Sequence, residues 1–158
     1  MALQLEIQNY KSILNAFSYT MINLLSNESS NIDKPLTEDA WSLRQHVYHL
    51  LDTPLGGLHE ALSHGLLNPN PILEVIPDLD NLNCDRKTFI PAQIIQDINT
   101  YRISFNQVLD SYDNTKLDSI IIKTHFPKRN FTEDRTARTL LDRLFIRHWS
   151  EHLYDITN

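Results

Sequence analysis

The chain has 158 residues, a formal net charge of −6 and a single cysteine, Cys84. The length fits one domain, residues 1–158, and the acidic balance without a basic stripe argues against a nucleic-acid partner. Cys84 alone excludes an internal disulfide and a cysteine-pair zinc motif, and the absence of a signal-like segment or an apolar stretch of about 18 residues predicts a cytoplasmic protein without membrane contact.

The first element expected is a long helix at the N-terminus. Seven apolar residues follow one another at steps of four and three from Leu3 to Leu24, the spacing of a helix that buries one stripe. We interpret this stripe as core packing. Residues 27–35, rich in Asn, Ser and Asp, are predicted to form a loop.

A second helix is expected to begin near Thr37, a suitable N-cap, and to run to about Asp52. Pro54 and a Gly-Gly pair then kink or interrupt it, and its continuation ends at residues 65–67.

The segment 68–88 is rich in Asn, Asp and Pro. We predict a long loop or short-helix insertion here, in which residues 72–76 form a helical turn or an extended piece. Connections of this length are uncommon in a compact domain and often cover a site.

A third helix should open with Pro91 in its first turn and end near Leu109. Residues 117–128 are too short to classify by periodicity. A fourth helix is expected to start around Asn130 or Thr132 with acidic residues in its first turn. Four amphipathic helices with moderate connections predict an all-α fold, a four-helix bundle.

The fourth helix carries the main candidates for a functional site. On a helical wheel His148 and His152 continue its apolar stripe, whereas Arg143 and Arg147 fall on the opposite face. The two histidines are i,i+4 neighbours with Cβ atoms about 5–6 Å apart, so both imidazoles can reach one metal ion. Because burying two unpartnered imidazoles costs free energy, we predict that they bind a divalent metal.

The same stretch also reads His-x-x-Glu-His, the inverted signature of some zinc proteases. Those enzymes need a glutamate ligand well downstream of the motif. Only six residues follow His152 and none is glutamate, so we reject the protease interpretation.

A third ligand is expected from the second helix, where His46 and His49 are i,i+3 neighbours. Periodicity alone favours His46, because His49 lies about 100° from the centre of the apolar row. Trp41-Ser42, followed by His49-Leu50 and Asp52, resembles the second-helix signature W-S-x(6)-H-L-x-D of the DinB/YfiT-like superfamily. The pair His148 and His152 resembles the H-x-x-x-H motif on the last helix of that superfamily.

This resemblance implies a DinB/YfiT-like bundle in which His49, His148 and His152 hold a divalent metal, zinc or nickel, beside an open position for water. It further implies a thiol-dependent S-transferase, or a related hydrolase or isomerase, acting on a small electrophile with a low-molecular-weight thiol as co-substrate. A homodimer is expected on the same ground. Two alternatives stay open: a non-catalytic metal-binding or stress-response protein, and a helical interaction domain without metal.

The sequence leaves alternative roles open for other polar residues near these motifs. His46 is either a group beside the metal or a boundary residue. Asp52 either orients His49 or lies on a solvated helix face, and an acid/base role for Glu151 is not favoured because it points away from the stripe. The remaining histidines are expected at the surface: His59, His64 and His125.

Overall fold

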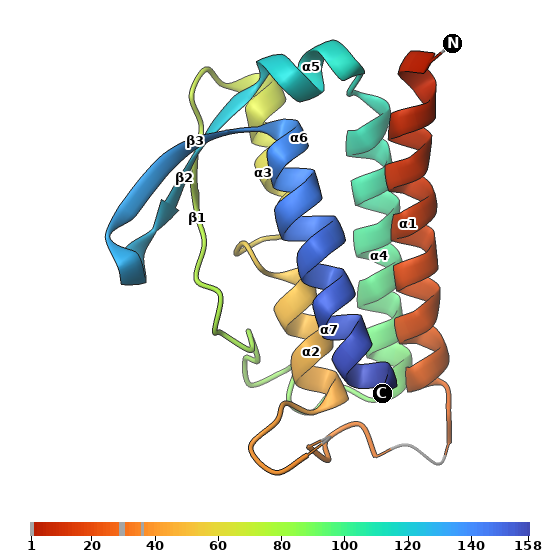
Figure 1. Cartoon of the computed structure of the whole chain (residues 1–158). Coiled ribbons are helices and arrows are strands. Elements are labelled where there is room, and N and C mark those ends of the chain that lie inside the picture. The colour runs from red at the N-terminus through yellow and green to blue at the C-terminus, as the bar shows by residue number, and fades with distance from the viewer. Residues whose placement is uncertain (1, 29–30, 36) are drawn as a thin grey trace.

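The protein is a bundle of four long helical segments with a small sheet on one side (Figure 1). The computed structural model describes residues 2–28, 31–35 and 37–158, and side chains from Glu6 onward. The bundle consists of α1 (Ala2–Leu25), α2 (Leu43–Leu51) continued by α3 (Leu58–Leu67), α4 (Pro91–Asp110), and a last helix made of α6 (Ala137–Leu140), a π-helical segment (Leu141–Arg147) and α7 (His148–Thr157). The predicted four-helix bundle is thereby confirmed.

A three-stranded sheet lies outside the bundle, so the expectation of an all-α fold is wrong in this part. Its strands, in the order β1-β2-β3, are β1 (Ile72–Glu74), β2 (Ile121–Phe126) and β3 (Phe131–Thr136). β1 is parallel to β2, which is antiparallel to β3 across a short 3-10 helix (Pro127–Arg129). The helix α5 (Asn114–Ser119) precedes β2 and lies across one end of the bundle (Figure 1). The insertion between the second and third helices therefore contributes an edge strand, the extended alternative for residues 72–76.

The apolar stripe of α1 faces the core as expected, and α1 packs against α4 and α7. The side chains of Ile7, Tyr10, Leu14 and Met21 are buried, and those of Phe17 and Leu24 are partly buried. The side chain of Leu3 lies outside the described residues.

Aromatic rings join three of the bundle helices. Phe145, in the π-helical segment, is fully buried. Its ring centroid lies 5.6 Å from that of Phe17, 5.2 Å from that of Phe105 and 5.3 Å from that of Trp149, each pair meeting edge to face. This geometry is favourable for aromatic quadrupoles. The deepest row of the last helix therefore runs through Phe145 and Trp149, and the two histidines lie at its edge rather than at its centre.

The helix α2 begins at Leu43 and not near Thr37. Ser42 and Gln45 form a capping box, in which the Gln45 N–H points to Ser42 Oγ at 3.4 Å and the Ser42 N–H donates to Gln45 Oε1 at 2.8 Å. These two bonds satisfy backbone donors that the first turn leaves free. The interruption after α2, and the bounds of α3 and α4, agree with the sequence-based prediction.

The last helix begins at Ala137 and not around residues 130–132. Residues 131–136 are paired along their whole length with β2, which takes their backbone groups out of a helix. Thr136 ends the strand and caps the helix, because its side chain accepts a hydrogen bond from the Thr139 N–H at 3.1 Å.

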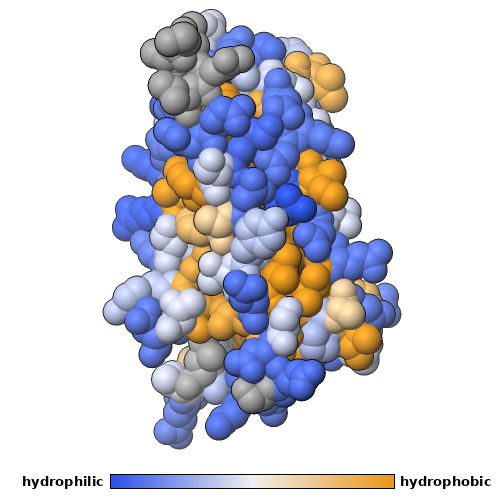
Figure 2. Space-filling view, turned by 90° about the vertical axis from the view of Figure 1, so that its right-hand side faces the viewer, coloured by the Kyte–Doolittle hydropathy of each residue, from blue (hydrophilic) through white to orange (hydrophobic). Residues whose placement is uncertain are grey.

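The face of the molecule that includes α1 is hydrophilic over much of its area, with apolar side chains between the polar ones (Figure 2). Among large side chains, Tyr19 on α1 and Ile103 on α4 are each more than half exposed. None of the described helices combines the length and hydropathy that a bilayer crossing requires.

Candidate metal centre

Three histidines meet where α2 packs against α7. One nitrogen from each of His49, His148 and His152 can be chosen so that the three atoms lie within 4.8 Å of one another. His49 is fully buried and the other two are half-buried. The structure thus brings together the three residues that the family resemblance implies as ligands.

The tautomer of His49 is fixed by the insertion. Its Nδ1–H donates to the carbonyl oxygen of Leu79 at 2.7 Å, since a carbonyl can only accept. Nε2 of His49 therefore carries a lone pair, and it points at Nε2 of His148 at 2.9 Å. In metal sites, the ring nitrogen of a ligating histidine that does not bind the metal usually donates a hydrogen bond to a carbonyl or carboxylate.

His46 is hydrogen-bonded to His152. The Nδ1 atoms of His46 and His152 lie 2.9 Å apart, so one donates a hydrogen bond to the other. This bond leaves Nε2 of His152 free. The indole of Trp41 stacks on the His152 ring at a centroid distance of 5.9 Å and meets the His49 ring at 4.6 Å. His46 is thus a partner of one candidate ligand, the first of its two expected roles, and Trp41 is a wall of the site.

Burial keeps these imidazoles neutral. Burial, with a smaller contribution from the neighbouring histidines, lowers the pKa of His152 to about 3 and that of His148 to about 4. Burial also lowers the pKa of His49 and of His46. Neutral imidazole is the form that binds a metal ion.

The donor set fits a divalent ion. Two nitrogens bound to one tetrahedral ion are about 3.3 Å apart, so the His49–His148 separation of 2.9 Å needs only a small opening. The Nδ1 atom of His148 is buried without a hydrogen-bond partner among the residues that the structure describes, although the nearby Leu144 carbonyl raises the pKa of His148. In the metal-free protein Nε2 of His148 donates a hydrogen bond to the lone pair of His49 Nε2, and a bound ion would take the place of that proton.

The cluster opens on two sides. The opening beside His152, here named the acidic mouth, has a volume of about 570 Å³, and its lining includes Asp39, Trp41, His46, Asp78, His152 and Asp155. The opening beside His148, here named the arginine pocket, has a volume of about 530 Å³, and its lining includes Arg129, Arg135, Arg143, Arg147, His148 and Glu151. Pro77, in the insertion, lines both openings.

The helical wheel is wrong about Arg143, which lines the same pocket as His148; Arg147 also lines this pocket but is exposed, as the wheel predicts. The His148 N–H donates to the carbonyl of Arg143, five residues back, which is the π-helical pattern. Residues i and i+5 then lie on one face, as i and i+4 do in an α-helix. The wheel assumed an unbroken α-helix and had no means of detecting this segment.

Asp52 and Glu151 are each paired with an arginine. The carboxylate of Asp52 accepts from Arg86 and does not contact His49. Glu151 accepts from Arg147 at 3.0 Å on the exposed side of α7.

Of the three histidines expected at the surface, His64 is exposed. His125 is partly buried at the sheet and lies 2.8 Å from the hydroxyl of Thr132. The prediction is wrong for His59, whose side chain is only 12% exposed and meets the Tyr101 ring edge to face at 4.7 Å.

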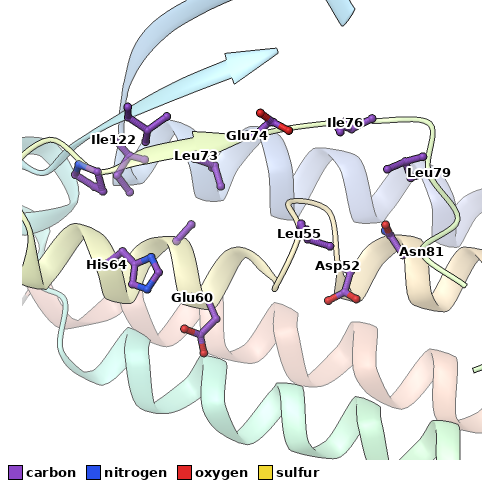
Figure 3. Close-up of a pocket in the computed structure, with 13 residues that line it drawn as sticks. Asp52, Leu55, Glu60, His64, Leu73, Glu74, Ile76, Leu79, Asn81 and Ile122 are labelled. Atoms are coloured by element: carbon purple, nitrogen blue, oxygen red, sulfur yellow. The ribbon is translucent and has the colours of Figure 1, made fainter. Parts of the chain in front are cut away.

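A third cavity, the outer pocket, lies between α3 and β1 (Figure 3). Its volume is about 330 Å³, and its lining includes Asp52, Leu55, His64, Leu73, Glu74 and Leu79. None of the three clustered histidines lines it. In Figure 3, Leu73 and Leu79 point from the insertion toward the helices. Leu79 thus contributes its side chain to this pocket and its carbonyl to His49.

The fold and the cluster together define a four-helix bundle with a histidine-rich, metal-compatible centre. No protein-family model matches the chain, and no curated protein matches its sequence. Among solved structures the chain is similar to YfiT from Bacillus subtilis, described as a probable metal-dependent hydrolase with an unusual four-helix bundle topology. The TM-score is 0.69 at 18% identity, covering 96% of this chain and 83% of the other. The predicted resemblance to the DinB/YfiT-like superfamily is therefore confirmed for the fold.

Proposed function

We propose that the protein is a divalent-metal-dependent hydrolase that acts on a small molecule. The observation that carries the proposal is the meeting of His49, His148 and His152, with nitrogens within 4.8 Å, between two openings that admit solvent. The description of YfiT as a probable metal-dependent hydrolase supports the same reaction class.

In this proposal His49, His148 and His152 hold the ion, Zn²⁺ or Ni²⁺, both of which suit imidazole ligands. A divalent ion held by three protein ligands supplies Lewis-acid polarisation of the substrate and activates water for attack. The other residues orient the ligands: the Leu79 carbonyl fixes His49, and His46 holds His152 through their Nδ1 atoms.

The first test is metal content, measured by elemental mass spectrometry on untagged protein after reconstitution with Zn²⁺ or Ni²⁺. We expect about one ion per chain in the wild type and in the control His64→Ala, because His64 is an exposed histidine outside the cluster. The double variant His148→Ala/His152→Ala should retain none. A wild type that takes up neither ion would overturn the proposal.

The second test is hydrolysis of a panel of esters, amides and phosphoesters, with and without a chelator. Loss of turnover on chelation, and its return with added metal, is the expected result. Metal-loaded protein that hydrolyses no member of the panel would count against a hydrolase and would favour a non-catalytic metal site.

Thiol transfer, which the sequence resemblance implies, stays a prediction. A thiol titration in the same reaction mixtures separates the two activities, because transfer consumes a thiol and hydrolysis does not. The expected homodimer also stays a prediction, and light scattering tests it.

A further inference from the structure

We propose that the arginine pocket binds an anionic group of the substrate, a carboxylate or a phosphoryl group, beside the metal centre. This inference rests on the proposed function, since it names the substrate class of the same site. Its starting point is a local reversal of charge. The chain has a net charge of −6, yet four of its eight arginines line this one pocket, and among the described residues of the lining Glu151 is the only acidic one.

Two of these arginines have no partner of their own. Arg129 and Arg143 make no ion pair or side-chain hydrogen bond with any of the described residues, and both are exposed where they line the pocket. Arg147 is paired with Glu151, and Arg135 with Glu133. Like charges gathered without counter-charges repel one another, and a bound anion relieves that repulsion.

The pocket is also built by elements that fix the positions of its cations. Arg135 is held against the sheet, with its side chain 11% exposed and its guanidinium 4.9 Å from the centroid of the Phe126 ring. Arg143 faces the pocket because the π-helical segment turns it toward His148. The two walls, the β2–β3 hairpin and the last helix, thus present guanidinium groups to a shared space.

The chemistry of guanidinium selects the ligand. Its planar fork of donors matches the two oxygens of a carboxylate or phosphoryl group, and such charge-assisted bonds are stronger than neutral ones. The opposite opening carries Asp39 and Asp155, and also Asp78, which is paired with Lys128; this balance of charge disfavours an anion. An anionic substrate is therefore oriented with its charge on the His148 side.

The test is calorimetric titration of the full chain, metal-free and metal-loaded, with two probes: inorganic phosphate and succinate. Dimethyl succinate is the uncharged match for succinate. We expect both anions to bind the metal-free protein, more weakly at higher salt, and the diester not to bind. The tighter probe identifies the substrate group as phosphoryl or carboxylate.

The variant Arg129→Gln/Arg143→Gln removes the two unpaired guanidiniums, and we expect it to weaken anion binding at least about tenfold. The control Lys34→Gln/Lys87→Gln makes the same change in net charge at exposed lysines that do not line the pocket. It should change affinity less than about twofold, because the distant charges are screened.

Equal weakening by both double variants would overturn the inference, since it would show a general charge effect. Anion binding that requires the metal and ignores the arginines would overturn it too. Metal uptake, measured on the same samples, separates the two proposals. Uptake without arginine-dependent anion binding refutes only this inference, and anion binding without uptake refutes only the hydrolase.

Discussion

The contact between His46 and His152 predicts a measurable effect on metal affinity. When Nε2 of His152 binds an ion, its Nδ1 carries the proton and donates to His46 Nδ1, 2.9 Å away. The variant His46→Phe keeps a ring of similar shape against Trp41 but removes the acceptor. The donor on His152 is then left without a protein partner.

The magnitude follows from burial. Leaving a buried donor unpaired costs about 1–3 kcal/mol, and His46 is only 5% exposed. His152 itself is half-buried at the acidic mouth, so water replaces part of the lost bond. We therefore expect a loss of about 1–2 kcal/mol, or roughly 5–30-fold in the metal dissociation constant. This range overlaps the effect of removing other partners of metal-ligating histidines, about 10–100-fold.

The assay is competition for Zn²⁺ with a chromophoric chelator. His46→Gln restores an acceptor and should recover most of the affinity, and His64→Phe is the control at an exposed histidine. Unchanged affinity in His46→Phe would refute the orienting role. A loss above about a thousandfold would refute it differently, because it would make His46 a ligand.

Three further predictions concern stability, each measured by urea unfolding. Phe145→Ala should cost about 3–5 kcal/mol, because it empties a fully buried site between three aromatic rings; a loss under 1 kcal/mol would contradict the described core. Ser42→Ala removes the capping box with Gln45 and should cost about 0.5–2 kcal/mol, whereas Ser26→Ala, at an exposed serine, should cost less. Metal-free protein should lose stability as the pH falls from 6.5 toward 4, because burial lowers the pKa of His148 to about 4 and the unfolded chain takes up the proton first. The slope contributed by each such histidine is up to about 1.4 kcal/mol per pH unit, and a flat profile would contradict the neutral cluster.

The helices could be predicted because their patterns are local. The spacing from Leu3 to Leu24, and the opening of α4 at Pro91, are visible in a window of two or three turns. The sheet could not be predicted from the sequence in the same way. β3 has few apolar residues and no clear alternation, and β1 pairs with a strand about 50 residues away, as in Leu73 with Thr124. Such pairing depends on chain contacts that no window contains.

Part of the candidate site could likewise be predicted from local sequence, and part could not. His148 and His152 could be found because their spacing has a chemical meaning on a helix, while the choice of His49 over His46 needed the family motif. The Leu79 carbonyl that orients His49 is a backbone group, and every residue has one. Its role follows only from the path of the insertion, which no residue type encodes.

The π-helical segment makes this helix one residue longer than its two ends require. A sequence alignment with a regular α-helix would need a gap between Leu141 and Arg147. A helical wheel drawn from one end of the helix therefore assigns residues beyond this segment to the wrong face. Deleting one residue between Arg143 and His148 should therefore restore regular α-helical pitch. The two residues would then be i,i+4 neighbours and would still share a face, so the helix tolerates a deletion here that would rotate its two ends apart anywhere else along its length.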